Sequence, residues 1–119
     1  MKLITQVFAL NVAALIFSSI ASADNAVGTW GMDCGPADVL KIQTQKNEVL
    51  VYLHNPTVGW KAWKGIGSHT DVFLKSYQAV VQQAMAQGKK ITVRFPAGHN
   101  CAATDYSSKP YMVNLSLDV

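Results

Sequence analysis

One segment of the chain has the periodicity of an amphipathic helix. Its apolar residues follow the i, i+4, i+7, i+8, i+11 spacing of a single stripe, formed by Phe73, Tyr77, Val80, Val81 and Ala84. The other regular segments are short and rich in strand-forming residues, and three of them alternate with the period of two that is typical of β-strands. One helix among several short strands predicts a small α+β domain that is mainly β.

Signals at both ends of this stripe predict the limits of the helix. Ser68 and Asp71 have the spacing of a capping box, and Gly88 followed by two lysines is typical of a helix end. We therefore expect one helix over residues 69–87. Phe73, Tyr77 and Val81 should be buried, and the side chains expected to face solvent are Lys75, Gln78, Gln82 and Gln83.

Five segments have the composition of β-strands, three before the helix and two after it, and the third is apolar on both faces from Val49 to Leu53, which suits a central strand. They are residues 27–32, 39–45, 48–54, 90–95 and 111–117. Cys34-Gly35-Pro36 predicts a turn that ends the first strand, in which Trp30 should be buried, and Lys46-Asn47 predicts a hairpin connection. Residues 58–67 and 96–110 are expected to form loops.

The N-terminal 23 residues have the three regions of a secretory signal peptide. A basic start at Lys2 precedes an apolar run and the small-residue sequence Ala21-Ser22-Ala23. Residues 24–119 would then form one exported domain that begins at Asp24, is periplasmic or secreted, and has no membrane partner after cleavage. No later apolar run approaches the ~18 residues that a membrane span needs.

The chain has two cysteines, Cys34 and Cys101. Export to an oxidising compartment favours a disulfide between them. The chain-entropy model gives about 4 kcal/mol for closing a loop of this size. A metal site is disfavoured because the sequence has no C-x-x-C spacing or second Cys or His cluster.

The predicted element order, strand-strand-strand-helix-strand-strand, is that of the five-stranded OB-fold barrel. The chain resembles small exported bacterial proteins with this arrangement and, more distantly, is similar to the B subunits of pentameric bacterial toxins. The resemblance covers most of residues 27–117. It depends on Val49–Leu53, on the helix-to-strand passage from Ser76 to Phe95 and on the cysteine that follows. It implies an OB-like barrel and, for the toxin subunits, oligomers that bind glycans.

Several functional classes are disfavoured by composition and spacing. Without Lys2 the net charge is +2, which, together with export, argues against a nucleic-acid partner. The only glutamate is Glu48, and common hydrolase, metalloprotease and phosphate-binding motifs are missing from the sequence. His54, His69 and His99 lack the spacing of a metal site. We therefore expect no catalytic residues, no metal and no cofactor.

Two segments remain as candidate ligand-binding surfaces. The first contains Trp60, Lys61, Trp63 and Lys64 between glycines, and aromatic rings beside cations suit a sugar, a nucleobase or the carboxylates of a partner. The alternative is that both tryptophans cover the end of the domain while the lysines are solvated. The second segment offers the hydrogen-bonding side chains of His99 and Asn100.

The sequence thus predicts an exported, non-enzymatic binding module for a glycan or a protein. A first alternative is a toxin-like B subunit that forms a homo-oligomer and binds host glycans. A second alternative is an enzyme or enzyme inhibitor that acts through its loops.

Overall fold

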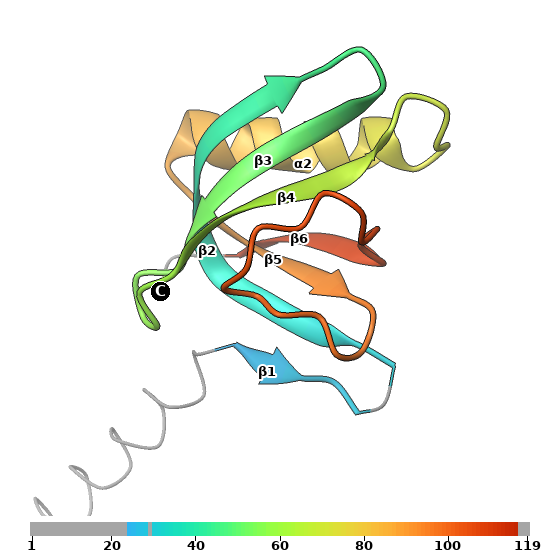
Figure 1. The fold of residues 1–119 in the computed structure, drawn as a ribbon. Helices are drawn as coiled ribbons and strands as arrows, with labels where there is room; N and C mark the ends of the chain where they lie inside the picture. Colours follow the sequence, from blue (N-terminus) through green and yellow to red (C-terminus); the bar gives the residue numbers. More distant parts are fainter. Residues whose placement is uncertain (1–23, 29, 117–119) are drawn as a thin grey trace, which may run out of the picture.

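The computed structural model describes residues 24–28 and 30–116, so the predicted signal peptide lies outside the described residues. Within this part of the chain, strands predominate and one helix is present (Figure 1). The elements are β1 Asn25–Ala26, β2 Met32–Thr44, β3 Glu48–His54, β4 Lys61–Ser68, α2 Leu74–Gln87, β5 Lys90–Phe95 and β6 Met112–Ser116. The prediction of a mainly β domain with one helix is confirmed.

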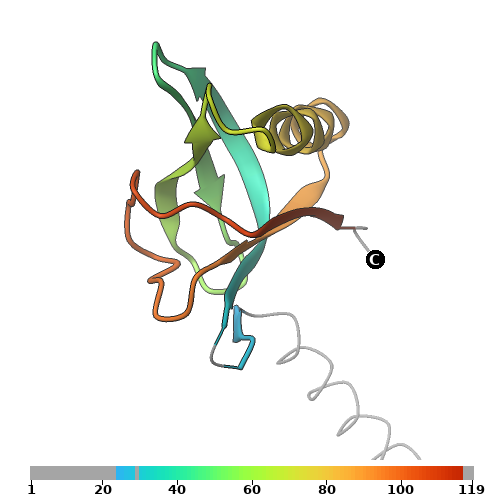
Figure 2. The ribbon, with the colours of Figure 1, turned by 90° about the vertical axis from the view of Figure 1, so that its right-hand side faces the viewer.

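The strands form one open antiparallel sheet in the order β4-β3-β2-β5-β6, with β1 paired to the start of β2. The long strand β2 joins the two halves. Its first part pairs with β5 and its second part pairs with β3, and it curves strongly along its length (Figures 1 and 2). The sheet therefore wraps partly around the core.

The predicted first strand and the turn after it are wrong. Cys34-Gly35-Pro36 lies inside β2, where the register with β5 shifts between Cys34 and Ala37. This irregularity brings Gly35 against β5, so that a Cβ there would lie 2.6 Å from the Ile91 carbonyl oxygen. Trp30, expected to be buried, is 64% exposed because it precedes β2 and is not part of the sheet.

The predicted loop at 58–67 is also wrong, because residues Lys61–Ser68 form β4 and pair with β3 along its length. Because glycine is disfavoured in strands, the sequence of β4 does not indicate a strand. The structure explains Gly65 by a close approach. A Cβ at this position would lie 2.7 Å from the carbonyl oxygen of Tyr106, in the loop that crosses β4.

The helix closes one end of the curved sheet, where it packs against β2, β4, β5 and β6 (Figure 2). Val81 and Ala84 are fully buried, Tyr77 is half-buried, and three of the four residues expected to face solvent are exposed. Gln78 is the exception because it is half-buried. The helix ends at Gly88, as predicted, and Gly88 adopts the left-handed conformation.

The helix begins at Leu74, five residues later than predicted, so Phe73 precedes it. The Ser68 N–H donates to Asp71 Oδ2 at 2.8 Å, and the Asp71 N–H donates to the Ser68 carbonyl. These bonds close a separate turn before the helix. The capping-box residues do interact, but they do not begin α2.

The predicted disulfide is present. Cys34 in β2 is bonded to Cys101 in the segment between β5 and β6, and both residues are buried. The bond attaches this long connection to the sheet. Beside it, the core is filled from the inner faces of the strands, including Val51, Leu53 and Phe95.

Candidate functional site

Trp60, in the connection between β3 and β4, is a structural residue. Its indole is buried, and Nε1–H donates to Asp24 Oδ2 at 2.6 Å. The other oxygen of Asp24 accepts from the Gly35 N–H and from Asn55 Nδ2. This carboxylate therefore connects the start of the described chain to β2 and to the β3–β4 connection. Trp60 thus covers part of the domain, which is the alternative to its being an exposed ligand contact.

Lys64 is fully buried, so it is neither a solvated lysine nor an accessible ligand contact. Its Nζ lies 2.9 Å from His99 Nε2, donates to the Asn100 carbonyl at 2.9 Å, and donates to the Ala103 carbonyl. Burial lowers the pKa of Lys64 to about 8, although Asp105 and Asp24 favour its charged form. The two candidate segments thus meet inside the protein.

His99 is buried and stacks on Phe95 with a centroid distance of 3.9 Å. Burial, and then the charge of Lys64, lower the pKa of His99, while Asp105 raises it. When Lys64 donates to Nε2, the neutral imidazole carries its proton on Nδ1, which lies 3.5 Å from Asp105 Oδ2. The buried polar cluster of Lys64, His99 and Asp105 therefore anchors the β5–β6 connection.

Backbone bonds attach the same connection to β4. The Gly65 N–H donates to the Asp105 carbonyl, and the Asp105 N–H donates to the Trp63 carbonyl. Lys64 and Asp105 consequently form an isolated parallel bridge. Hydrogen bonds from Ser108 and Ser107 hold the pKa of Asp105 well below its usual value. The backbone bonds of Asp105 to Gly65 and Trp63 hold the next residue, Tyr106, beside the outer face of β4.

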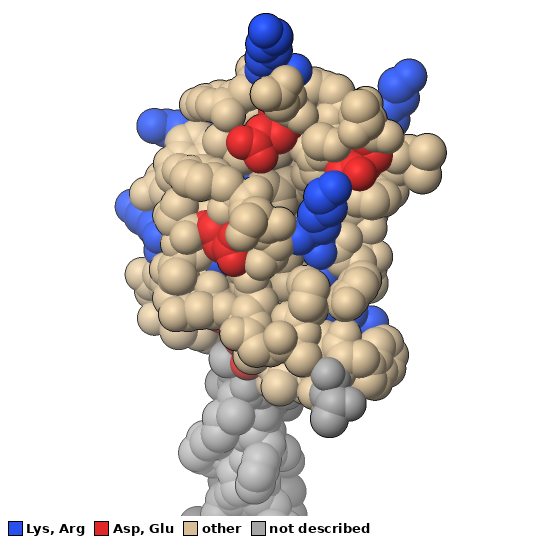
Figure 3. Space-filling view, turned by 45° about the vertical axis from the view of Figure 1, so that its right-hand side comes forward, with Lys and Arg blue, Asp and Glu red and all other residues tan. Residues whose placement is uncertain are grey.

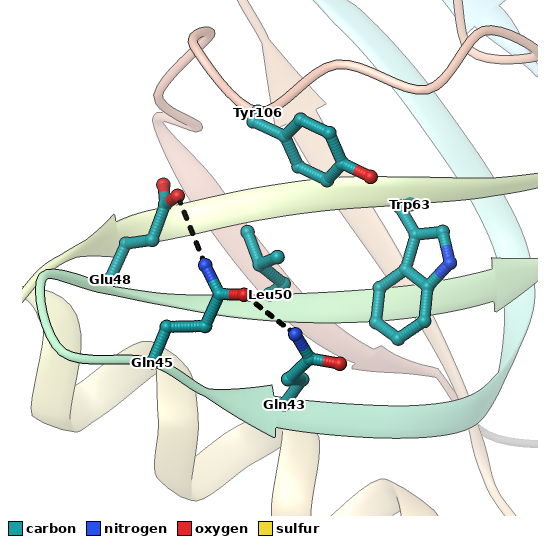
Figure 4. Close-up of a pocket in the computed structure, with 6 residues that line it drawn as sticks. All are labelled: Gln43, Gln45, Glu48, Leu50, Trp63 and Tyr106. Atoms are coloured by element: carbon teal, nitrogen blue, oxygen red, sulfur yellow. Dashed lines mark hydrogen bonds between the residues drawn. The ribbon is translucent and has the colours of Figure 1, made fainter.

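A pocket of about 360 Å³ lies between this connection and the outer face of the sheet (Figure 4). It is lined by Gln43, Gln45, Glu48, Leu50, Trp63 and Tyr106. Leu50 is buried, whereas Tyr106 is 50% exposed. In Figure 4, the polar side chains lie along one side and the two aromatic rings stand apart from them. We call this hollow the Trp63–Tyr106 pocket.

The polar and aromatic groups of this pocket are held by their neighbours. Gln43 Nε2 donates to Gln45 Oε1 at 2.6 Å, and Gln45 Nε2 donates to Glu48 Oε1 at 3.5 Å. The half-buried ring of Trp63 packs against Tyr52 with a centroid distance of 5.0 Å. The pocket thus presents amide and carboxylate groups beside two aromatic rings.

Of the six residues predicted to bind ligand, Trp63 alone lines this pocket. Lys61 is exposed at the start of β4, and the exposed Asn100 accepts through Oδ1 from the Ala102 N–H. Gln43 and Glu48 lie on strands that the composition of the sequence predicts. Tyr106 carries no such signal, because the fold alone brings its loop over β4.

Charged side chains do not gather into one basic patch on the face shown in Figure 3, where Lys and Arg stand apart from one another. Among residues 24–28 and 30–116, no three or more His, Cys, Asp or Glu residues are grouped to hold a metal ion. In the same part of the chain, no helix has the length and apolar character needed to cross a membrane.

Comparison of the chain with protein-family models, curated proteins and solved structures gives no match.

Proposed function

We propose that this chain is an exported OB-like protein that binds a glycan in the Trp63–Tyr106 pocket. The order of its elements supports the fold proposal. With β2 to β6 taken as five strands in chain order, the sheet runs 3-2-1-4-5, and α2 lies between the third and fourth strands. The parallel bridge of Lys64 to Asp105 brings the segment before the fifth strand against the third, which favours a partly closed barrel.

The position of the pocket is the observation that carries the binding proposal. OB-folds bind oligosaccharides and oligonucleotides on strands 2 and 3 and on the loops between strands 1 and 2 and between strands 4 and 5. Here Leu50 and Trp63 come from strands 2 and 3, Gln45 from the first of these loops and Tyr106 from the second. One hollow therefore combines all four regions.

The lining of the pocket favours a sugar over a nucleic acid. A sugar ring has apolar C–H faces that stack on aromatic rings and hydroxyl groups that pair with amides and carboxylates. Trp63 supplies such a ring, and Gln45 and Glu48 supply the polar partners. The carboxylate of Glu48 would repel phosphates, and export also argues against nucleic acid.

The disulfide between Cys34 and Cys101 supports export, because such bonds persist in oxidising compartments.

The toxin-like subunit is the oligomeric form of the same proposal. Light scattering distinguishes the toxin-like subunit from a monomeric binding protein, since a monomeric mass would exclude a pentameric assembly. An enzyme or enzyme inhibitor remains the other proposal, and no feature of the pocket favours it over binding.

A glycan array probed with the mature protein tests the proposal, followed by calorimetry with the strongest glycan. Tyr106→Ala should weaken binding at least about tenfold, because it removes a large aromatic contact. Tyr111→Ala is a matched control, since it removes an exposed tyrosine that does not line this pocket. Binding to no glycan, or equal effects of the two variants, would contradict the proposal.

A further inference from the structure

A second group of aromatic residues lies at the other end of the sheet. Trp30 and Tyr111 are 64% and 61% exposed, which is unusual for such large rings. Together with Arg94 and Met112 they line a hollow of about 310 Å³. None of these residues lines the Trp63–Tyr106 pocket. This hollow therefore has its own chemistry, independent of the proposed glycan site.

The sheet holds Arg94 in place within this hollow. Asp33, Arg94 and Met112 are partners in the register of β2, β5 and β6, so they form a row across three strands. Arg94 Nε donates to Asp33 Oδ1 at 2.7 Å, and Nη2 donates to Asp33 Oδ2 at 3.2 Å. The guanidinium also lies 5.7 Å from the centre of the Trp30 ring. Two bonds and a cation–π contact thus orient it.

Asp33 uses only part of the hydrogen-bonding capacity of Arg94. A guanidinium has five N–H donors, and the pair with Asp33 occupies two of them. Within residues 24–28 and 30–116, Nη1 donates to no protein group. Two parallel N–H donors at this end of a guanidinium match the two oxygens of a carboxylate.

We propose that this hollow is a binding site for an aromatic carboxylate. The ring of the ligand would lie against Trp30 and Tyr111, and its carboxylate would accept from the end of Arg94 that Asp33 leaves available. A hollow of about 310 Å³ is at the lower end of the range for small-molecule pockets, so one or two fused rings suit its size. The proposal does not rest on glycan binding.

The pair with Asp33 also limits the affinity. It neutralises the charge of Arg94, so the carboxylate is held by two directed hydrogen bonds and by ring contacts rather than by a positive field. At the ligand efficiency usual for drug-sized ligands, a two-ring acid would bind with a Kd of roughly 1 mM.

The test is an NMR titration of the mature protein with 1-naphthoate and with its neutral analogue 1-naphthamide. Naphthoate should shift the Trp30 indole N–H and Arg94 Nε–H signals with a millimolar Kd, and naphthamide should bind at least about fivefold more weakly. Trp30→Ala and Tyr111→Ala, both changes of exposed residues, should each weaken naphthoate binding at least about fivefold.

Two further variants make the test specific. Arg94→Gln should abolish the preference for naphthoate over naphthamide, and Trp63→Ala should leave naphthoate binding unchanged. No shift of the Trp30 signal at 20 mM probe, on the order of twenty times the expected Kd, would overturn the proposal. So would equal binding of both probes, or full binding to Trp30→Ala. None of these results depends on whether glycans bind.

Discussion

The buried ammonium of Lys64 should make the protein more stable at mildly alkaline pH. The pKa of this group is lowered from 10.5 in the unfolded chain to about 8 in the folded protein, chiefly by burial. Between these two values the unfolded chain binds more protons than the folded one. Linkage then requires the free energy of unfolding to rise as the pH rises through this range.

The size of the effect follows from the two pKa values. At pH 7 Lys64 is charged in both states, whereas at pH 9 it is mostly neutral in the folded protein and charged in the unfolded chain. Integration over this interval gives a gain of about 1 kcal/mol. For a domain of this size, that corresponds to a rise in Tm of about 4–8 °C.

Urea unfolding at pH 7 and pH 9 measures this gain directly. Lys64→Met should lose it, and Lys61→Met should keep it, because Lys61 is an exposed lysine on the same strand. Equal stability of the wild-type protein at the two pH values would refute the reasoning, even if Lys64→Met does not fold. A gain of the same size in Lys64→Met would refute it as well.

Three other predictions test the fold. Cys101→Ser removes the disulfide and should lower the free energy of unfolding by about 2–5 kcal/mol in urea titrations. Mass spectrometry of the intact wild-type protein without reductant should give a mass two protons lower than that of the reduced protein. Val81→Asp buries an unpaired charge and should abolish the cooperative thermal transition. The control Gln82→Asp changes an exposed residue and should alter the free energy of unfolding by less than about 0.5 kcal/mol. Similar thermal melts for the two variants would contradict the assigned helix faces. Asp24→Ala leaves the Trp60 indole N–H without its partner and should cost about 2–4 kcal/mol by chemical unfolding, and an unchanged midpoint would show that this carboxylate is not structural.

The parts of the fold that the sequence predicts correctly depend on local periodicity and local composition. A few consecutive residues are enough to show the stripe containing Val81, the helix end at Gly88, the strand Glu48–His54 and the alternation of Lys90–Phe95. The disulfide was predictable for a different reason, since two cysteines allow a single pairing.

The errors arise where contacts between distant segments override local signals. Gly65 suggests a loop, but its missing side chain makes room for the backbone of Tyr106 across β4. Cys34-Gly35-Pro36 suggests a turn, but β2 continues through it by shifting its register against β5. In both cases a glycine, Gly65 or Gly35, allows a backbone segment distant in the sequence to approach closely, and this contact exists only in the folded sheet.

The candidate site was predictable only in part for the same reason. The sequence identifies Trp63 as an aromatic residue beside cations, yet its neighbour Lys64 points inward because successive side chains of a strand alternate. Once β4 is known to be a strand, this alternation places Trp63 on the outer face of the sheet and Lys64 on the inner face. The contribution of Tyr106 depends on the Lys64–His99–Asp105 cluster and on the bridge to β4, neither of which has a sequence pattern.

The most direct test of the account is a crystal structure of the mature protein with the strongest glycan from the array. We expect a sugar ring stacked on Trp63, with its hydroxyl groups paired to Gln45 or Glu48 and Tyr106 on its other side. A glycan bound elsewhere on the protein, with the Trp63–Tyr106 pocket unoccupied, would contradict the central claim.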